Sequence, residues 1–241
     1  MNAEKLSKRL EKVAEYIIPG STLADIGSDH AYLPCYAAKK NLIKAGIAGE
    51  VSEGPFQSAV NQVRASGLEE VITVRKGDGL EVLSPNEAGC ITIAGMGGTL
   101  ISSILENGKE KLEGVSRLIL QPNIGAPNVR DWLRQNGWEL MAESILEEDG
   151  KIYEILSAER GDAHKPYRVN EKASMLLGPY LMTERNEAFM KKWKHELHHM
   201  KRIHEQLDQS SKKGNAGKRL ELSEQIKIVE AVLIDETGER S

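Results

Sequence analysis

The chain has few cysteines and no long apolar run, and both absences narrow its class. Its 241 residues include only Cys35 and Cys90, too few for a disulfide framework and too far apart for a metal-binding knuckle. No apolar stretch approaches the ~20 residues that a membrane-spanning helix needs. The N-terminus, Met-Asn-Ala-Glu-Lys-Leu, lacks the apolar core of a signal peptide. We therefore expect a cytoplasmic protein with reduced cysteines, no metal site and no membrane contact.

Charge is distributed unevenly along the chain, although the net charge is only −4. Residues 1–159 hold 16 Lys and Arg against 23 Asp and Glu, a balance of −7, whereas residues 160–241 hold 16 against 13, a balance of +3. Five of the six histidines also lie in the second part. A basic C-terminal part favours a polyanionic partner, and a solvated Lys-rich helix surface is the alternative.

The segment 23–34, Leu-Ala-Asp-Ile-Gly-Ser-Asp-His-Ala-Tyr-Leu-Pro, indicates a strand that runs into Asp25, a turn on Gly27 and a following helix. Such turns hold nucleotide-like cofactors, but Asp29 replaces the second glycine of the dinucleotide fingerprint. A carboxylate at the end of the first strand suits a ligand with positive charge, such as S-adenosylmethionine. An ordinary turn capped by Ser28 or Asp29 is the alternative.

Two more acidic residues follow the next predicted strands. Glu50 ends a strand over residues 44–51, near the interval at which a carboxylate accepts hydrogen bonds from ribose hydroxyls. Asp78 lies between two glycines after a strand over 71–74, where it could accept from an adenine amino group or serve only as a turn residue. Three acidic strand ends in succession favour a cofactor site that includes Asp25, Glu50, Asp78 and Gly79.

The remaining pattern predicts five βα units closed by an antiparallel hairpin, which makes a seven-stranded α/β sheet. A buried strand over 89–98 runs into a glycine loop whose Ala94, Gly95 and Met96 form one wall of the cleft. The fifth strand, 117–120, ends before a loop, Gln121-Pro122-Asn123. Further predicted elements are an N-terminal helix over 4–18 that packs on the sheet edge near the cofactor turn, helices over 32–41, 55–66, 100–112 and 129–136, and hairpin strands over 138–147 and 151–159.

After residue 160 the pattern is helical only. Two apolar seams predict an antiparallel two-helix coiled coil, the first through Met182, Phe189, Trp193, Glu196, Met200, Ile203 and Leu207 and the second through Leu222, Ile226, Val229 and Leu233. We expect one domain over 1–160 and a helical domain over 161–241. Basic residues around the coiled coil are candidates for phosphate contacts: Lys191, Lys192, Lys194, Lys201, Arg202, Lys212, Lys213, Lys218 and Arg219.

Two strings carry a closer resemblance, Asp25-Ile-Gly-Ser-Asp-His-Ala-Tyr-Leu-Pro34 and Ile93-Ala-Gly-Met-Gly-Gly98. Together with the C-terminal coiled coil, they are similar to the bacterial tRNA (adenine-22, nitrogen-1) methyltransferases of the TrmK type, within the class I S-adenosylmethionine-dependent methyltransferases. The resemblance covers essentially the whole chain and implies methyl transfer to ring nitrogen-1 of an adenine in the D-arm region of tRNA. The Asn/Asp-Pro-Pro-aromatic signature of amino-directed adenine methyltransferases is replaced by Ala94-Gly-Met-Gly97, which argues against an exocyclic amine as acceptor.

Within that resemblance, Asp29 and His30 are the candidate catalytic residues because they follow the cofactor turn directly. Asp29 would accept from the adenine amino group as the ring becomes cationic, and His30 would position the base or shuttle a proton. A helix-capping Asp29 and a buried, hydrogen-bonded His30 are the alternatives. Tyr32, Met96, Gln121 and Asn123 are candidates for contacts with the base.

Two other classes of function compete with this hypothesis. A non-catalytic adapter built on a degenerate methyltransferase core would have no physical need for three acidic strand ends. A small-molecule methyltransferase is disfavoured by the basic helical part. We expect a monomer or weak oligomer.

Overall fold

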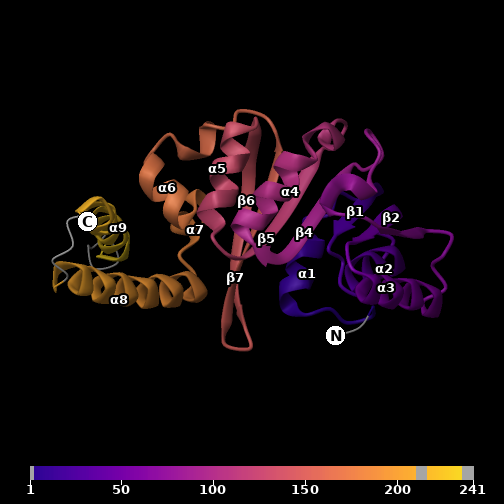
Figure 1. The fold of residues 1–241 in the computed structure, drawn as a ribbon, viewed down its shortest axis with the longest axis horizontal. Coiled ribbons are helices and arrows are strands. Elements are labelled where there is room, and N and C mark those ends of the chain that lie inside the picture. Colours follow the sequence, from indigo (N-terminus) through magenta and orange to yellow (C-terminus); the bar gives the residue numbers. More distant parts are fainter. Residues whose placement is uncertain (1–2, 210–215, 235–241) are drawn as a thin grey trace.

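The protein folds around a seven-stranded sheet that has helices on both faces, as Figure 1 shows for the computed structural model. The structure describes residues 3–209 and 216–234. The strand order is β3-β2-β1-β4-β5-β7-β6, and β7 runs in the opposite direction to the other six strands. The strands are β1 (Ser21–Ile26), β2 (Ile43–Glu50), β3 (Ile72–Lys76), β4 (Cys90–Gly97), β5 (Arg117–Ile124), β6 (Trp138–Glu148) and β7 (Lys151–Arg160). The predicted α/β sheet is thereby confirmed.

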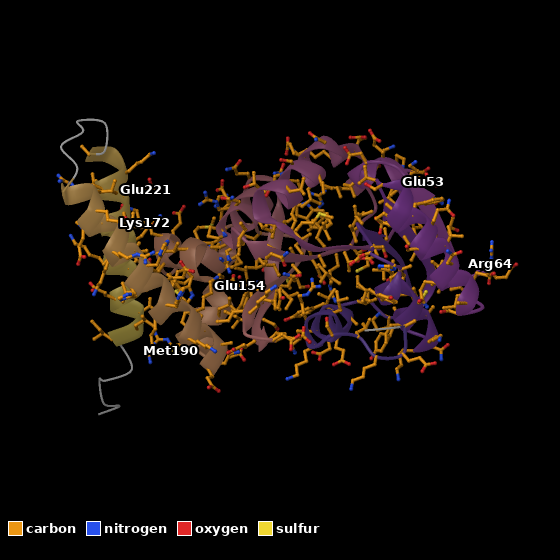
Figure 2. All side chains as sticks on the ribbon, turned by 60° about the horizontal axis from the view of Figure 1, so that its bottom comes forward. Glu53, Arg64, Glu154, Lys172, Met190 and Glu221 are labelled. Carbon is orange, nitrogen blue, oxygen red and sulfur yellow. The ribbon has the colours of Figure 1, made fainter. Side chains whose placement is uncertain are left out.

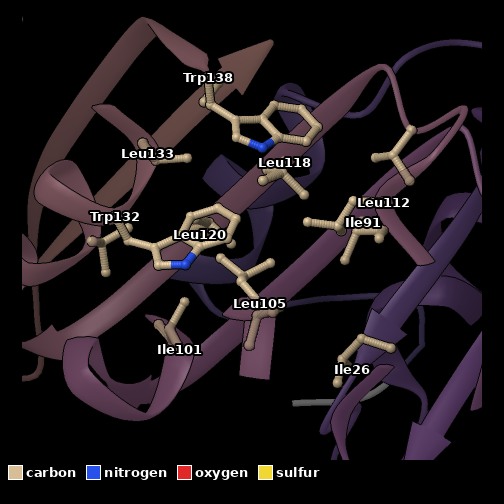
Figure 3. Packing of buried hydrophobic residues seen from close by; sticks show 14 of the residues in the cluster. Ile26, Ile91, Ile101, Leu105, Leu112, Leu118, Leu120, Trp132, Leu133 and Trp138 are labelled. Atoms are coloured by element: carbon tan, nitrogen blue, oxygen red, sulfur yellow. The ribbon is translucent and has the colours of Figure 1, made fainter. Parts of the chain in front are cut away.

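Two helical layers cover the sheet because successive strand residues point to opposite faces. On β5, Leu118 and Leu120 pack in the core under Trp132 and Leu133 (Figure 3), whereas Ile119 packs on the other face. The first face carries α4 (Gly98–Asn107) and α5 (Ala126–Gln135), and the second carries α1 (Lys8–Glu15), α2 (Tyr32–Lys39) and α3 (Glu53–Ala65). Short 3-10 turns lie at Gly79–Val82, Lys109–Leu112 and Lys165–Tyr167.

Three elements differ from the sequence prediction. Helix α1 lies over the face of the sheet and not only at its edge, because Val13 shares a buried cluster with Leu23 of β1 and Ile119 of β5. It also contacts the edge strand β6, where the carboxylate of Glu148 accepts from the backbone N–H groups of Lys8 (2.6 Å) and Arg9 (3.3 Å). Helix α4 ends at Asn107, before the 3-10 turn. The predicted loop 121–123 continues β5, since Gln121 pairs with Ala94 of β4.

The β6–β7 hairpin closes the sheet as predicted. Its turn has Asp149 at φ 50° and Gly150 at φ 73°, the positive values that favour an Asp-Gly hairpin turn. Among the described helices, none is long and apolar enough to cross a membrane.

The described residues of the C-terminal part form four α-helices, whereas the seams predicted two. Helices α6 (Glu171–Leu177) and α7 (Pro179–Glu184) precede the long α8 (Glu187–Gln209) and α9 (Ala216–Ile234). Met182 therefore lies outside α8: Arg185 is left-handed at φ 46°, and the Asn186 side chain accepts from the N–H of Phe189 to begin a new helix. Helices α8 and α9 pack together, and Lys201 pairs with Glu230 at 2.6 Å.

A buried charge cluster joins the helical part to the sheet. Arg130 on α5 is fully buried and donates to Glu143 of β6 (2.7 Å) and to Glu154 of β7 (2.6 Å). Glu143 also accepts from the backbone N–H of Tyr180 in α7 (3.1 Å), and Lys192 of α8 pairs with Glu154. The three buried ionic side chains, Arg130, Glu143 and Glu154, therefore connect five elements: α5, β6, β7, α7 and α8.

Candidate active site

The turn after β1 is built on a buried carboxylate. Asp25 is 3% exposed, and its two oxygens accept from the hydroxyls of Ser28 and Thr92, each at 2.6 Å. Burial raises the pKa of Asp25, and these two hydrogen bonds and the positive charge of Arg9 oppose the rise. Asp25 thus holds the turn through its hydrogen bond with Ser28 and places negative charge at the end of β1. This is the point where strand order reverses between β1 and β4.

Three consecutive non-glycine residues of this turn are left-handed. Asp29, His30 and Ala31 have φ values of 44°, 68° and 52°. A left-handed conformation costs a residue with a side chain roughly 1–2 kcal/mol, and such strain gathers at functional sites. The Asp29 side chain is 78% exposed and that of His30 46% exposed, with 3.5 Å between carboxylate oxygen and imidazole nitrogen. His30 also stacks on Tyr32, with ring centroids 5.3 Å apart.

Neither structural alternative for these two residues agrees with this geometry. Ala31 occupies the N-cap position of α2, which has no side-chain cap, and the Ser28 hydroxyl is engaged by Asp25. His30 is not buried. The catalytic roles of Asp29 and His30 stay predictions, but helix capping and core packing no longer explain the two residues.

Glu50 braces the strained turn from the neighbouring strand. It is 5% exposed, and its carboxylate accepts from the backbone N–H of Asp29 at 2.5 Å. Burial raises the pKa of Glu50, and the Asp29 N–H opposes the rise. Asp78 is exposed one strand further along, and Gly79 is left-handed at φ 52° beside a cavity of about 160 Å³.

Arg9, Gln121 and Asn123 hold the predicted glycine loop, whose residues 94–97 form the irregular last part of β4 where its register with β5 shifts. The side-chain oxygen of Gln121, which is fully buried, accepts from the N–H of Gly95 (3.0 Å) and from the Arg9 guanidinium. The amide of Asn123 donates to the carbonyl oxygen of Gly95 (2.7 Å) and accepts from Gln121 (3.3 Å). Gln121 and Asn123 therefore fix the backbone of the loop, and contact with the substrate base remains a prediction for them.

Arg9 is the residue of this network that sequence reasoning missed. Its contact with Gln121 spans 112 positions, and only the apolar stripe of its helix was visible in the sequence.

The site fits a nucleoside cofactor with a cationic end. Gly27 is left-handed at φ 69°, a conformation that favours glycine, and a Cβ there would lie 2.2 Å from the Met96 methyl carbon, so a larger residue would also displace the end of the Met96 side chain. Carboxylates at the ends of β1, β2 and β3 supply acceptors for hydroxyl and amino groups and attract positive charge. Ala94 lies in β4, the strand on the other side of β1 from β2.

A second hollow lies between the sheet and the C-terminal helices. A cavity of about 680 Å³ is bounded by the end of β5, the start of β7 and α8, with Asn123, Ile124, Ile152, Trp193, His195 and Met200 among its lining residues. Since Asn123 also holds Gly95, this cavity adjoins the glycine loop.

The predicted basic cluster is partly neutralised by ion pairs. Lys191 pairs with Glu147 at 2.6 Å, Lys192 with Glu154, and Lys201 with Glu230. Lys194 and Arg202 are exposed on α8, and Lys218 and Arg219 are exposed on α9. Lys212 and Lys213 lie outside the described residues. Within the described ranges, no group of three or more His, Cys, Asp or Glu could hold a metal ion.

Comparison with known proteins assigns a family. The family profile described as tRNA (adenine(22)-N(1))-methyltransferase, TrmK, matches residues 23–231. The chain is 53% identical over 235 residues to the Bacillus subtilis (strain 168) protein named tRNA (adenine(22)-N(1))-methyltransferase, covering 97% of this chain and 99% of that one.

Comparison with solved structures supports the same family. The crystal structure of the B. subtilis TrmK methyltransferase superposes with a TM-score of 0.93 at 52% identity, over 95% of this chain and 99% of that one. The Streptococcus pneumoniae protein Sp1610, solved in complex with S-adenosyl-L-methionine, superposes with a TM-score of 0.84 at 43% identity, over 95% of this chain and 100% of that one.

Proposed function

This chain belongs to the tRNA (adenine(22)-N(1))-methyltransferase family, and from that membership we propose how its residues carry out the reaction. It is an S-adenosylmethionine-dependent enzyme that methylates ring nitrogen-1 of adenine 22 in tRNA. The observation that carries our assignment of residues is the strained, exposed Asp29 turn, braced by Glu50 and set beside the glycine loop.

Carboxylates on three adjacent strands bind the cofactor in our proposal. Glu50 accepts from ribose hydroxyls through the carboxylate oxygen that Asp29 leaves available, and Asp78 accepts from the adenine amino group. Asp25 supports the turn and supplies negative charge near the cationic groups. Gly27, Gly79, Ala94 and Gly95 let the backbone approach the ligand closely. S-adenosylmethionine supplies the methyl group, which is activated because it is bonded to the cationic sulfonium sulfur.

Asp29 and His30 act on the substrate base. Ring nitrogen-1 of adenine attacks with a free lone pair, so no proton must be removed first, and the enzyme contributes orientation and charge placement. Asp29 accepts from the exocyclic amino group and stabilises the positive charge that develops on the ring. His30, stacked on Tyr32, positions the base, and Met96, whose side chain lies against Gly27, is a further contact for it.

The helical part holds the tRNA. We propose that residues 1–160 form the catalytic domain and that residues 161–241 position the substrate through exposed basic side chains on α8 and α9. Because nitrogen-1 lies on the pairing edge, a paired adenine must be unstacked before it enters the cleft. We propose that the protein acts on tRNA in the cytoplasm as a monomer or weak oligomer.

The product identifies the reaction. Incubation with methyl-labelled S-adenosylmethionine and unmodified tRNA, followed by digestion to nucleosides, is expected to place the label in 1-methyladenosine. Label in N6-methyladenosine would contradict the proposed acceptor atom. Absence of both cofactor binding and methylation would instead support a non-catalytic adapter.

Charge reversal on α8 is expected to weaken tRNA binding. In the double variant Lys194→Glu, Arg202→Glu, we expect tRNA affinity to fall about 10-fold or more near physiological salt, because two phosphate contacts are lost. The slope of log affinity against log salt concentration is also expected to become shallower, by about 0.7–0.9 for each lost contact. Filter binding across a salt series measures both quantities.

Arg64→Glu serves as the control, because Arg64 is exposed on α3, at the opposite end of the molecule from Met190 and Lys172 (Figure 2). Equal affinities for the double variant and the control would remove α8 from the tRNA interface.

A further inference from the structure

The acidic residues at three adjacent strand ends indicate how the cofactor is oriented along the edge of the sheet. β1, β2 and β3 are neighbours, and Asp25, Glu50 and Asp78 lie at or just after their carboxyl ends. If Glu50 serves the ribose and Asp78 the adenine, the amino-acid end of S-adenosylmethionine belongs at β1 and β4. That end carries an ammonium, a sulfonium and one anionic group, the α-carboxylate. Carboxylates of the protein suit the two cations, but the anion needs a positive partner.

Helix α1 brings a guanidinium to this end of the site. One terminal nitrogen of Arg9 donates to Gln121 and lies 3.4 Å from the position that a Cβ on Gly95 would occupy. The same side chain is close enough to Asp25 for its charge to lower the pKa of that carboxyl. Arg9 therefore lies beside both the β1 turn and the β4 loop.

The position of Arg9 is fixed from two sides. Its backbone N–H and that of Lys8 donate to Glu148 at the N-terminus of α1. Its guanidinium carbon lies 5.2 Å from the ring centroid of Tyr153 on β7, a cation–π distance. The hairpin strands thus hold both the helix and the side chain, which lowers the entropy lost when the guanidinium binds a ligand.

Arg9 keeps donors available for an anion. Among the residues that the structure describes, its side chain makes one hydrogen bond, from Nη1, whereas a guanidinium has five N–H groups. The side chain is partly exposed. A planar guanidinium with free N–H groups matches the geometry of a carboxylate.

We propose that Arg9 binds the α-carboxylate of S-adenosylmethionine and, through Gln121, couples that contact to the position of the glycine loop at Gly95. This proposal rests on the proposed function. It assigns to helix α1, which precedes the sheet, a direct part in cofactor recognition.

Comparison of two ligands tests the contact. Isothermal titration calorimetry on the full chain would measure S-adenosylmethionine and its decarboxylated analogue, which lacks only the α-carboxylate, with the wild type and with Arg9→Ala. We expect Arg9→Ala to lower the affinity for S-adenosylmethionine about 10–100-fold, as for a lost charge-assisted hydrogen bond, and to change the affinity for the analogue less than about 3-fold. Arg9→Lys keeps the charge but not the planar guanidinium, and its affinity for S-adenosylmethionine is expected to lie between those of the wild type and Arg9→Ala.

Two further variants separate recognition from loop shape. Gln121→Ala removes the link to Gly95 and is expected to lower the affinities for both ligands by the same factor. Lys8→Ala changes the exposed neighbour on α1 and is expected to bind both ligands as the wild type does. Equal weakening of both ligands by Arg9→Ala, or none, would overturn the carboxylate contact while leaving the methyltransferase assignment intact. Failure of the wild type to bind either ligand would overturn both.

Discussion

Replacing Asp29 with asparagine is expected to lower kcat for tRNA methylation by about 100–1,000-fold, the typical loss when one group that stabilises transition-state charge is removed. Asparagine tolerates the left-handed conformation and keeps the shape of the side chain, but it removes the negative charge that would face the developing ring cation. Affinity for S-adenosylmethionine is expected to change less than about 3-fold, because Glu50 contacts the backbone of Asp29, not its side chain. Single-turnover kinetics and calorimetry give the two numbers.

Glycine at the same position separates strain from catalysis. Asp29→Gly relieves a left-handed residue and is expected to raise the free energy of unfolding by about 1 kcal/mol while methylation is lost. A variant with asparagine that methylates tRNA at the wild-type kcat, with cofactor affinity unchanged, would remove Asp29 from the chemistry and leave His30 as the candidate.

Replacing Arg130 with methionine is expected to lower the free energy of unfolding by about 3–5 kcal/mol, because two buried carboxylates lose their shared partner. Glu143 and Glu154 are 5% and 4% exposed, and Lys192 would remain beside Glu154 alone. Burial already raises the pKa of Glu143, and loss of the guanidinium would raise it further. The protonated carboxyl is then the favoured folded form, so the deficit relative to the wild type should shrink as the pH falls.

A second substitution tests the cause of that loss. Adding Glu143→Gln to Arg130→Met removes the unpaired charge and keeps an oxygen for the N–H of Tyr180, so we expect at least half of the lost stability to return. Urea denaturation of the three proteins at two pH values makes the comparison. A deficit below about 1 kcal/mol for Arg130→Met would mean that the cluster is not the main link between sheet and helices.

Local patterns in the sequence were enough for the sheet. The apolar strands and the Asp149-Gly150 turn predicted a seven-stranded α/β sheet closed by a hairpin, which the structure confirms. The break before α8 was also visible in principle, because Asn186 followed by Glu187 is a helix-start signal, but the heptad spacing from Met182 masked it.

Contacts distant in sequence could not be predicted in the same way. Arg9 contacts Gln121 and Arg130 contacts Glu154 only because the fold brings separate elements together. Nothing in the spacing of Arg9 distinguished it from the solvent face of an amphipathic helix. The left-handed Asp29–Ala31 turn was likewise not predicted, since glycine, the usual sign of such a conformation, is present only at Gly27.

Position of the methyl group tests the central claim most directly. A methyl on ring nitrogen-1 blocks the pairing edge of adenine, so reverse transcription of tRNA treated with the protein and S-adenosylmethionine is expected to stop at adenine 22. A tRNA with guanine in place of adenine 22 is expected to give full-length product. A stop at another adenine, or methyl incorporation without any stop, would contradict the account.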